Sequence, residues 1–383
     1  MANTAPLLTR DQIARDIQAW DGIADHRTGS AGDAQTDAWL SHEMRAAGVT
    51  GEVRHYPFER VDIEGCWAQI ERGPRITGVP MFDASPTGAE PVRGIAGADI
   101  PVSQFTPFDA HPLTEHTQRL RHENTHKAII AVSAAQGVRP GLALLNAEQY
   151  RTPFGPPVIQ ISSFEGADLL AHKGQPVQVL ANFTRSKADA TNLEARIPGT
   201  DRDAAPVVIM TPKSAWWTCT AERAGGIVVW LALLRHFAAN PPRRTVLFTA
   251  NSGHELSHLG LDYYLASNPD LAESAHVWLH LGANFAAASG HIRIQASNEQ
   301  GLIALTHALD DNGVSGHDAS KLGERPLGEA RNIHDKGGRY LSILGSNPWF
   351  HQPTDRFPTT IDLDKTVAVT TALVALMAHT ANA

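Results

Sequence analysis

The sequence predicts an α/β fold, with a doubly wound and mainly parallel sheet and a β-rich domain inserted into it. After residue 200, short apolar runs typical of buried strands alternate with helical patterns, as in sheets whose parallel strands are connected by helices. Between residues 61 and 195, helical periodicity mostly disappears, and short β-like runs alternate with turns rich in glycine and proline. We therefore expect a main domain of residues 1–60 and 196–383, interrupted by an inserted domain of residues 61–195.

Each expected element of the main domain follows from a local pattern. Helical patterns fill residues 9–48 and are broken by a turn at residues 25–30, whereas residues 52–60 alternate as a strand does. The later strands are short apolar, β-branched runs, and the later helices carry apolar residues at helical spacing. We expect these strands at residues 207–210, 245–250 and 275–281, and these helices at residues 224–239, 260–266 and 364–379.

Composition and charge restrict the possible functions. A chain of 383 residues with 42% apolar and 19% charged residues is an ordinary globular protein, long enough for two domains. Its net charge of −8 argues against a nucleic-acid partner, because no basic surface is available for the phosphate backbone. The longest apolar run, residues 226–234, is far shorter than the ~20 residues that a membrane span needs. We expect neither nucleic acid nor membrane as a partner.

The sequence also indicates a compartment. The first 20 residues lack the basic start and the apolar core of a signal peptide. Cys66 and Cys219 are far apart in the sequence and do not form a disulfide framework. We therefore expect a cytoplasmic protein.

Polar residues follow the expected strand at residues 245–250. This strand stops at residues 251–253, and His254 and Glu255 come next, before a helical pattern. In open α/β sheets, ligands bind at the carboxyl ends of the strands. We expect the functional site at this edge of the sheet.

Further polar residues come after other elements. Lys213 follows the expected strand at residues 207–210, and Glu222 stands at the start of an apolar helix, where a carboxylate also favours the positive end of the helix dipole. His351 lies late in the chain among aromatic residues, where a structural histidine is the common alternative. Carboxylate and imidazole groups that meet at one sheet edge suit Zn²⁺, Mn²⁺ or Fe²⁺.

Residues 254–258, HELSH, also spell H-E-x-x-H, the motif of zinc metalloproteases. That motif places its two histidines one turn apart on an established helix, with the glutamate as base. Here a strand and a break precede the motif, so we expect His254 to lie before the helix. The alternative is a metal held by His254 and His258 together.

The order of motifs along nearly the whole chain resembles that of the co-catalytic zinc aminopeptidases of the aminopeptidase Y and bacterial secreted aminopeptidase type. Their clan also holds glutamate carboxypeptidase and glutaminyl cyclase. HRTGSAGDAQTDAWLSHEMRAAGV resembles their opening R-x-x-G-S helix, and HKAIIAVSA and PPVIQISSFEGADLL resemble parts of their protease-associated domain. NLEARIPGT resembles the return to their catalytic domain, and FHQPTDRFPTTIDLD resembles their closing Y-H-x-x-x-D-x-x-x-x-I-D.

The resemblance implies two metal ions in the family and one in this chain. Thr211 and Gly282 stand where the family's H-x-D and N-L-D motifs supply the two ligands exclusive to one ion. The ligands of the other ion fall on Glu222, Glu255 and His351. We therefore expect one divalent transition metal per chain, zinc before manganese or iron, bound by these three residues.

The resemblance also implies catalytic roles for three neighbouring residues. His254 takes the place of the family's glutamate base, and an imidazole can do the same work. Lys213 takes the place of an aspartate, where its ammonium would lie near the lost ion and partly neutralise Glu222, unless it faces solvent. His280, at the end of the next strand, is either a second proton carrier or a core histidine.

The same comparison bears on the substrate. The residues that match the family's acidic region around the two ions are less acidic here, so we expect a substrate with a negative group. Lys213, Arg223 and Arg331 would form a cationic wall for a carboxylate. The alternative is that each arginine is paired with a nearby acid such as Glu329.

Together these features predict a mononuclear metal-dependent hydrolase, peptidase-like or an amidohydrolase. It would cleave an amide or related C–N bond of a small, carboxylated molecule or a short peptide. Trp216 and Trp217 would pack against an apolar part of that substrate, or else lie in the core. Two alternative functions are a non-hydrolytic enzyme that uses the metal for cyclising acyl transfer, elimination or isomerisation, and a metal-free scaffold with a decayed site.

Overall fold

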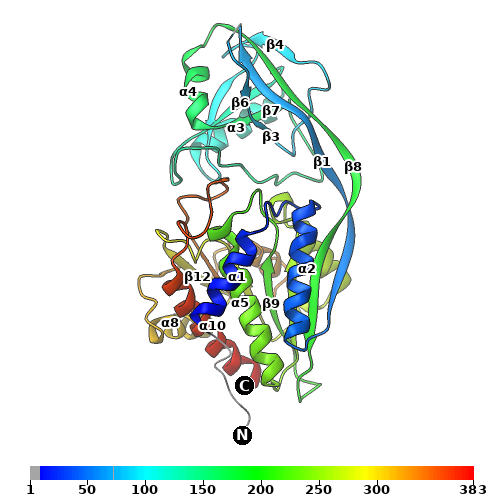
Figure 1. The fold of residues 1–383 in the computed structure, drawn as a ribbon, viewed down its shortest axis with the longest axis vertical. Coiled ribbons are helices and arrows are strands. Elements are labelled where there is room, and N and C mark those ends of the chain that lie inside the picture. Colours follow the sequence, from blue (N-terminus) through cyan, green and yellow to red (C-terminus); the bar gives the residue numbers. More distant parts are fainter. Residues whose placement is uncertain (1–8, 72) are drawn as a thin grey trace.

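The computed structural model describes residues 9–71 and 73–383, and Figure 1 shows two lobes joined by a long two-stranded ribbon. The ribbon consists of β1 (Gly51–Ile70) and the antiparallel β8 (Pro176–Ile197), which are paired along most of their length. Residues 1–8, part of the segment in which we expected no signal peptide, lie outside the described residues.

The larger lobe is built on a sheet with a parallel centre. The strands of this lobe are β9 (Val207–Pro212), β10 (Val246–Asn251), β11 (Val277–Leu281), β12 (Ile292–Ala296), β13 (Asp318–Ala319) and β14 (Tyr340–Gly345). The order across the sheet is β13, β12, β14, β11, β9, β10, β8, β1 and then β2 (Ile76–Thr77). Neighbours from β14 to β10 are parallel, whereas β12 and β8 flank them antiparallel. This arrangement confirms the expected mainly parallel sheet.

Helices cover both faces of this sheet, which makes it doubly wound. Val207 and Ile209 of β9 belong to a core cluster with the long central helix α5, whereas Val208 and Met210 belong to a cluster with Leu261 of α6. Successive side chains of a strand point to opposite faces, so both sets of β9 side chains from Val207 to Met210 are apolar. The helices of the lobe are α1 (Arg10–Asp21), α2 (Ala31–Ala46), α5 (Thr220–Ala239), α6 (Leu259–Ser267), α7 (Leu271–Ser274), α8 (Glu299–Asp311), α9 (Ala330–His334) and α10 (Leu363–Asn382).

The expected elements and the observed ones differ mainly at their ends. Helix α5 begins at Thr220 rather than at residue 224, because the Asp355 carboxylate accepts the backbone N–H groups of Ala221 and Glu222 at 2.9 and 3.1 Å. Asp355 lies 134 residues from Ala221 in the chain, so no local sequence pattern predicts this cap. Within the described ranges, no helix combines the length and the apolar character that crossing a membrane requires.

The smaller lobe has its own sheet and its own core. Its sheet runs in the order β3, β7, β6, β5, while β4 pairs with the ribbon strand β8. Its strands are β3 (Val79–Pro80), β4 (Val92–Ile95), β5 (Val102–Phe105), β6 (Ile129–Ser133) and β7 (Val158–Ile161). Helices α3 (Pro112–Glu123) and α4 (Ser163–Ala171) were not expected in this β-rich region. Helix α3 buries Thr114, Thr117 and Arg121, so its inner face is polar and no apolar stripe marks it in the sequence.

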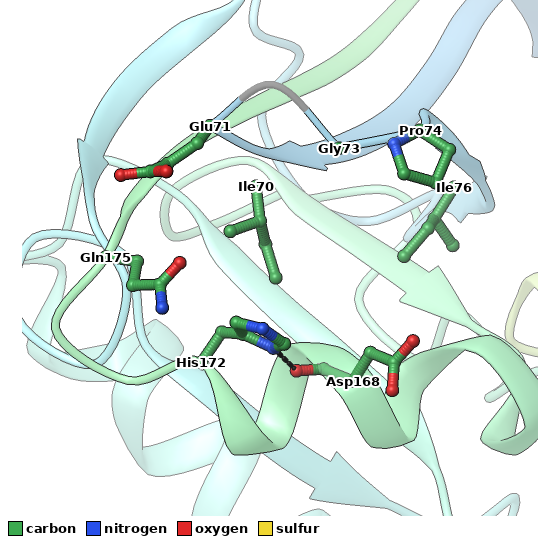
Figure 2. A pocket seen from close by; sticks show the side chains of 8 residues that line it. All are labelled: Ile70, Glu71, Gly73, Pro74, Ile76, Asp168, His172 and Gln175. Atoms are coloured by element: carbon green, nitrogen blue, oxygen red, sulfur yellow. Dashed lines mark hydrogen bonds between the residues drawn. The ribbon is translucent and has the colours of Figure 1, made fainter.

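A cavity of about 300 Å³ lies in the smaller lobe. Figure 2 shows the side chains that line it, with Ile70 and Ile76 on the ribbon side and Asp168 and His172 at the end of α4. The His172 ring is bonded to the backbone carbonyl of Asp168 in the same helical turn. None of the polar residues expected at the sheet edge lines this cavity.

Candidate active site

Lys213 follows the carboxyl end of β9 and is fully buried. Its ammonium lies 2.5 Å from Asp33 and 2.9 Å from Asp37, both on α2, and donates to the Ser252 hydroxyl at 2.7 Å. Burial alone would lower the pKa of Lys213, but the two carboxylates outweigh it and raise that pKa. The ion pairs of Lys213 therefore hold α2 against the sheet edge. The expectation that it neutralises Glu222 or faces solvent is corrected, because it is buried and its ion-pair partners are Asp33 and Asp37.

Glu255 is held by the turn that follows α1. Thr28 donates its backbone N–H and its hydroxyl to Glu255 Oε1 at 2.8 and 2.6 Å, and Ser214 donates its hydroxyl to Oε2 at 2.6 Å. His26 anchors this turn, because its ring stacks on Trp20 with 3.5 Å between the centroids. Both oxygens of the buried Glu255 carboxylate are thus bound by protein donors.

Glu222, at the start of α5, lies between a cation and an imidazole. Its Oε1 is 2.6 Å from Arg223 Nη2 and 3.3 Å from His351 Nε2. Arg223 Nε donates to the Ser214 carbonyl at 2.9 Å, and His351 Nδ1 is bonded to the Leu144 carbonyl at 2.7 Å. Burial raises the pKa of Glu222, but Arg223 and His351 outweigh it and bring that pKa to about 2. Glu222 is therefore ionised and shares a buried cluster with both neighbours.

Glu329, just before α9, joins two of the expected catalytic histidines. Its Oε1 lies 2.6 Å from His254 Nδ1 and its Oε2 lies 3.2 Å from His280 Nε2. The other ring nitrogen of His280 is bonded to the Ser342 hydroxyl at 2.8 Å. Burial raises the pKa of Glu329, but the neighbouring His254 and His258 lead the effects that lower it well below its ordinary value. No local pattern marks Glu329, whose position in the site comes from tertiary structure.

His258 completes a group of possible metal ligands with His254 and Glu329. One ligand atom of each residue lies within 4.8 Å of the others, and all three residues are buried. Burial lowers the pKa of His258 to about 3, which keeps its imidazole neutral, and its Nδ1 is bonded to the Asn332 side chain at 2.8 Å. Two histidines and one carboxylate are an established ligand set for catalytic zinc. The donor types and their spacing therefore fit a zinc ion.

The expected trio of Glu222, Glu255 and His351 is not assembled in the structure. Among the described residues, one group of three histidine, cysteine or carboxylate ligands has its atoms within 4.8 Å of one another, and none of the trio belongs to it. Other groups already engage two of the three, because Arg223 pairs with Glu222 and Thr28 binds Glu255. The ligand role of each residue stays a prediction that metal analysis of variants can test.

His254 and His258 meet, but not with the geometry of the metalloprotease motif. Their ring centroids are 5.1 Å apart. η1 (His254–Leu256) is a single 3-10 turn, and Ser257 and His258 have left-handed backbone with φ of 63° and 59°. Helix α6 begins only after this turn, as we expected, and Glu255 is bound elsewhere and does not face a shared metal as the motif requires.

The expected cationic wall does not form. Arg331 pairs with Glu148 at 2.7 Å, Arg223 pairs with Glu222, and Lys213 pairs with two aspartates. Each of the three cations therefore has a carboxylate partner within the protein. For the two arginines, this agrees with the alternative that each is paired with an acid. The partner of Arg331 is Glu148 of the smaller lobe rather than an acid close in sequence.

The two tryptophans lie where the lobes meet. Trp216 is buried, packs edge-on against Phe82 with 4.9 Å between the centroids, and donates its ring N–H to Asn146 at 2.9 Å. Trp217 donates its ring N–H to the backbone carbonyl of His351 at 3.1 Å. Trp216 thus follows the core alternative, whereas Trp217 helps to fix the position of His351.

Residues 139–148 of the smaller lobe cover the candidate site. Leu144 binds His351 through both of its backbone groups, donating its N–H to the His351 carbonyl at 3.3 Å and accepting from Nδ1 at 2.7 Å. Ala147 donates its N–H to the Glu255 carbonyl at 2.8 Å. The smaller lobe is therefore part of the site, which sequence analysis did not anticipate.

Solved structures place this arrangement among known folds. No protein-family model matches the chain, and no curated protein matches its sequence. The chain is similar to BSAP, a zinc aminopeptidase from Bacillus subtilis, with a TM-score of 0.79 and 13% identity over 98% of this chain and 96% of that one. It is also similar to an aminopeptidase from Aneurinibacillus sp. strain AM-1, with a TM-score of 0.71 and 15% identity over 98% and 94% of the two chains. A peptidase M28 precursor from Shewanella amazonensis SB2B gives a TM-score of 0.75 and 14% identity over 98% and 97%.

This chain has the zinc aminopeptidase fold. The likeness confirms the fold that the order of motifs predicts. At such low identities it establishes the fold alone. The activity must be inferred from the residues of this site.

Replacing Lys213 should reveal how much the buried ion pair contributes. Lys213→Met leaves the carboxylates of Asp33 and Asp37 buried without a cation, and should lower the free energy of unfolding by ~3–5 kcal/mol in urea titrations. Lys127→Met is the matched control, because that ammonium is half exposed and 3.5 Å from Asp99. Equal, small decreases in the free energy of unfolding of both variants would show that the buried Lys213 ion pairs do not hold α2 to the sheet edge.

The pH dependence of stability should report His26. Burial lowers the pKa of His26 from 6.5 to about 3, so between these values the unfolded chain binds a proton that the folded protein does not. Stability therefore falls as the pH drops below 6.5. As the pH drops below 6.5, the free energy of unfolding should fall less steeply in His26→Asn than in the wild type. The two slopes should differ by up to ~1.4 kcal/mol per pH unit. Parallel pH profiles for the two proteins would contradict this assignment.

Proposed function

We propose that this protein is a zinc-dependent hydrolase that cleaves an amide bond in a short peptide or another small molecule. The observation that supports this best is the buried group of His254, His258 and Glu329 beyond the end of β10, in a zinc aminopeptidase fold. Three protein ligands leave one position of a zinc ion open. Bound there, zinc would lower the pKa of a water molecule or polarise an amide carbonyl.

The surrounding residues support one zinc ion at this group. His280 is hydrogen-bonded to Glu329, and Asn332 is hydrogen-bonded to His258. Such hydrogen bonds are typical of the outer partners that orient metal ligands. His280 is fully buried, and both of its ring nitrogens are engaged, so we assign it a positioning role rather than proton transfer. His254 becomes a ligand in this proposal, in place of the base that sequence analysis expected.

The structure also bears on the size of the substrate. The segment 139–148 covers His351 and Glu255 through backbone hydrogen bonds, which favours small substrates over folded proteins. Because the expected cationic wall is not formed, the proposal does not require a carboxylated substrate.

Metal analysis of variants tests the proposal. Protein purified without chelator should contain close to one zinc ion per chain by elemental analysis. His258→Ala and Glu329→Gln each remove a ligand, and should weaken zinc binding by more than the ~10–100-fold that loss of an outer partner costs. His351→Ala should keep its zinc. Turnover of amino-acid anilides or N-acyl amino acids should disappear with a chelator and return with zinc.

Two results would contradict this assignment. Loss of zinc from His351→Ala, together with its retention in His258→Ala, would restore the trio expected from the sequence. A purified protein that binds no zinc under any condition would exclude zinc-dependent hydrolysis altogether.

A further inference from the structure

Buried polar atoms without hydrogen bonds surround Glu222. Within the described part of the chain, no hydrogen bond of good geometry reaches either carboxylate oxygen of Glu222, either Nη atom of Arg223 or Nε2 of His351. All three residues are 1% exposed. Such groups are uncommon in folded proteins, because each costs free energy when it is removed from water. Their concentration in one place calls for a physical explanation.

Two of the three side chains have the character of metal ligands. His351 Nδ1 donates to the Leu144 carbonyl, which directs Nε2 toward Glu222 Oε1 at 3.3 Å. A histidine fixed through a backbone carbonyl in this way is typical of metal sites. A buried carboxylate such as that of Glu222 needs a cation beside it.

Arg223 already supplies that cation. Its Nη2 lies 2.6 Å from Glu222 Oε1, and the guanidinium is always charged. Its Nε is tied to the Ser214 carbonyl at 2.9 Å, so the group cannot move away without leaving a buried donor unpaired. A divalent ion at Glu222 and His351 would meet this fixed positive charge at close range. The residues here therefore do not fit a metal ion.

We propose that Arg223 is a resident cation that takes the place of a metal ion between Glu222 and His351. It keeps this half of the cleft free of metal and restricts the chain to the single zinc ion at His254, His258 and Glu329. The second part of this inference rests on the proposed function, whereas the exclusion of metal by Arg223 does not.

Zinc stoichiometry in charge variants tests the inference. The full chain and its variants are dialysed to equilibrium against buffered zinc, and bound zinc is measured by elemental analysis. Arg223→Gln removes the charge and frees two ligands, and should bind one zinc ion more than the wild type. Arg223→Lys keeps the charge and should bind no more than the wild type. Adding Glu222→Gln to Arg223→Gln should cancel the gain, and Arg331→Gln is the control for loss of a paired arginine.

The outcome is read as a difference from the wild type. A gain in Arg223→Gln supports the inference even if the wild type binds no zinc, in which case only the proposed function fails. No gain in a folded Arg223→Gln, or an equal gain in Arg223→Lys, overturns it. If Arg223→Gln does not fold by circular dichroism, Glu222→Gln decides. Zinc binding equal to that of the wild type supports the inference, and weaker binding overturns it.

Discussion

A charge that is buried must find its counter-charge inside the protein, and this constraint organises the whole sheet edge. Lys213 meets the aspartates of α2, Arg223 meets Glu222, and Glu329 meets His254 and His280. The Lys213 and Glu329 pairings join segments that belong to different elements of the larger lobe, whereas Arg223 and Glu222 are neighbours in α5. The positions of the helices and of the candidate ligands are therefore coupled through the same ion pairs.

The same constraint explains which parts of the structure the sequence predicts. Strands such as β9 and β10 are recognisable in the sequence because a strand with helices on both faces is apolar over most of its length. The breaks after them locate the sheet edge, and the order of motifs predicts the fold. Helix α3 was missed because the residues on its buried face are polar, and the start of α5 was missed because its cap is the distant Asp355.

The site itself was predicted less well, for a different physical reason. Which charge pairs with which is decided across the fold, as with Lys213 and Asp33, 180 residues apart in the chain. Glu329 lies 75 residues from His254, and nothing near it in the sequence marks a ligand. Motif matching could place Glu222 and His351 side by side, but it could not show that the guanidinium of Arg223 would lie against them.

The smaller lobe takes part in the same network. Its segment 139–148 donates to and accepts from His351 and binds the backbone of Glu255, so these two residues are held from both lobes. Figure 1 shows that β1 and β8 carry this lobe on a long ribbon beyond the main sheet. Segment 139–148 and the sheet edge of the larger lobe are thus joined by hydrogen bonds, although they are far apart in the sequence.

The decisive question is whether the metal ion lies at His254, His258 and Glu329 or between Glu222 and His351. Anomalous diffraction at the zinc absorption edge, from crystals grown with zinc, tests it most directly. We expect one strong peak beside His254, His258 and Glu329. A peak between Glu222 and His351, or no peak at the histidine pair, would contradict it.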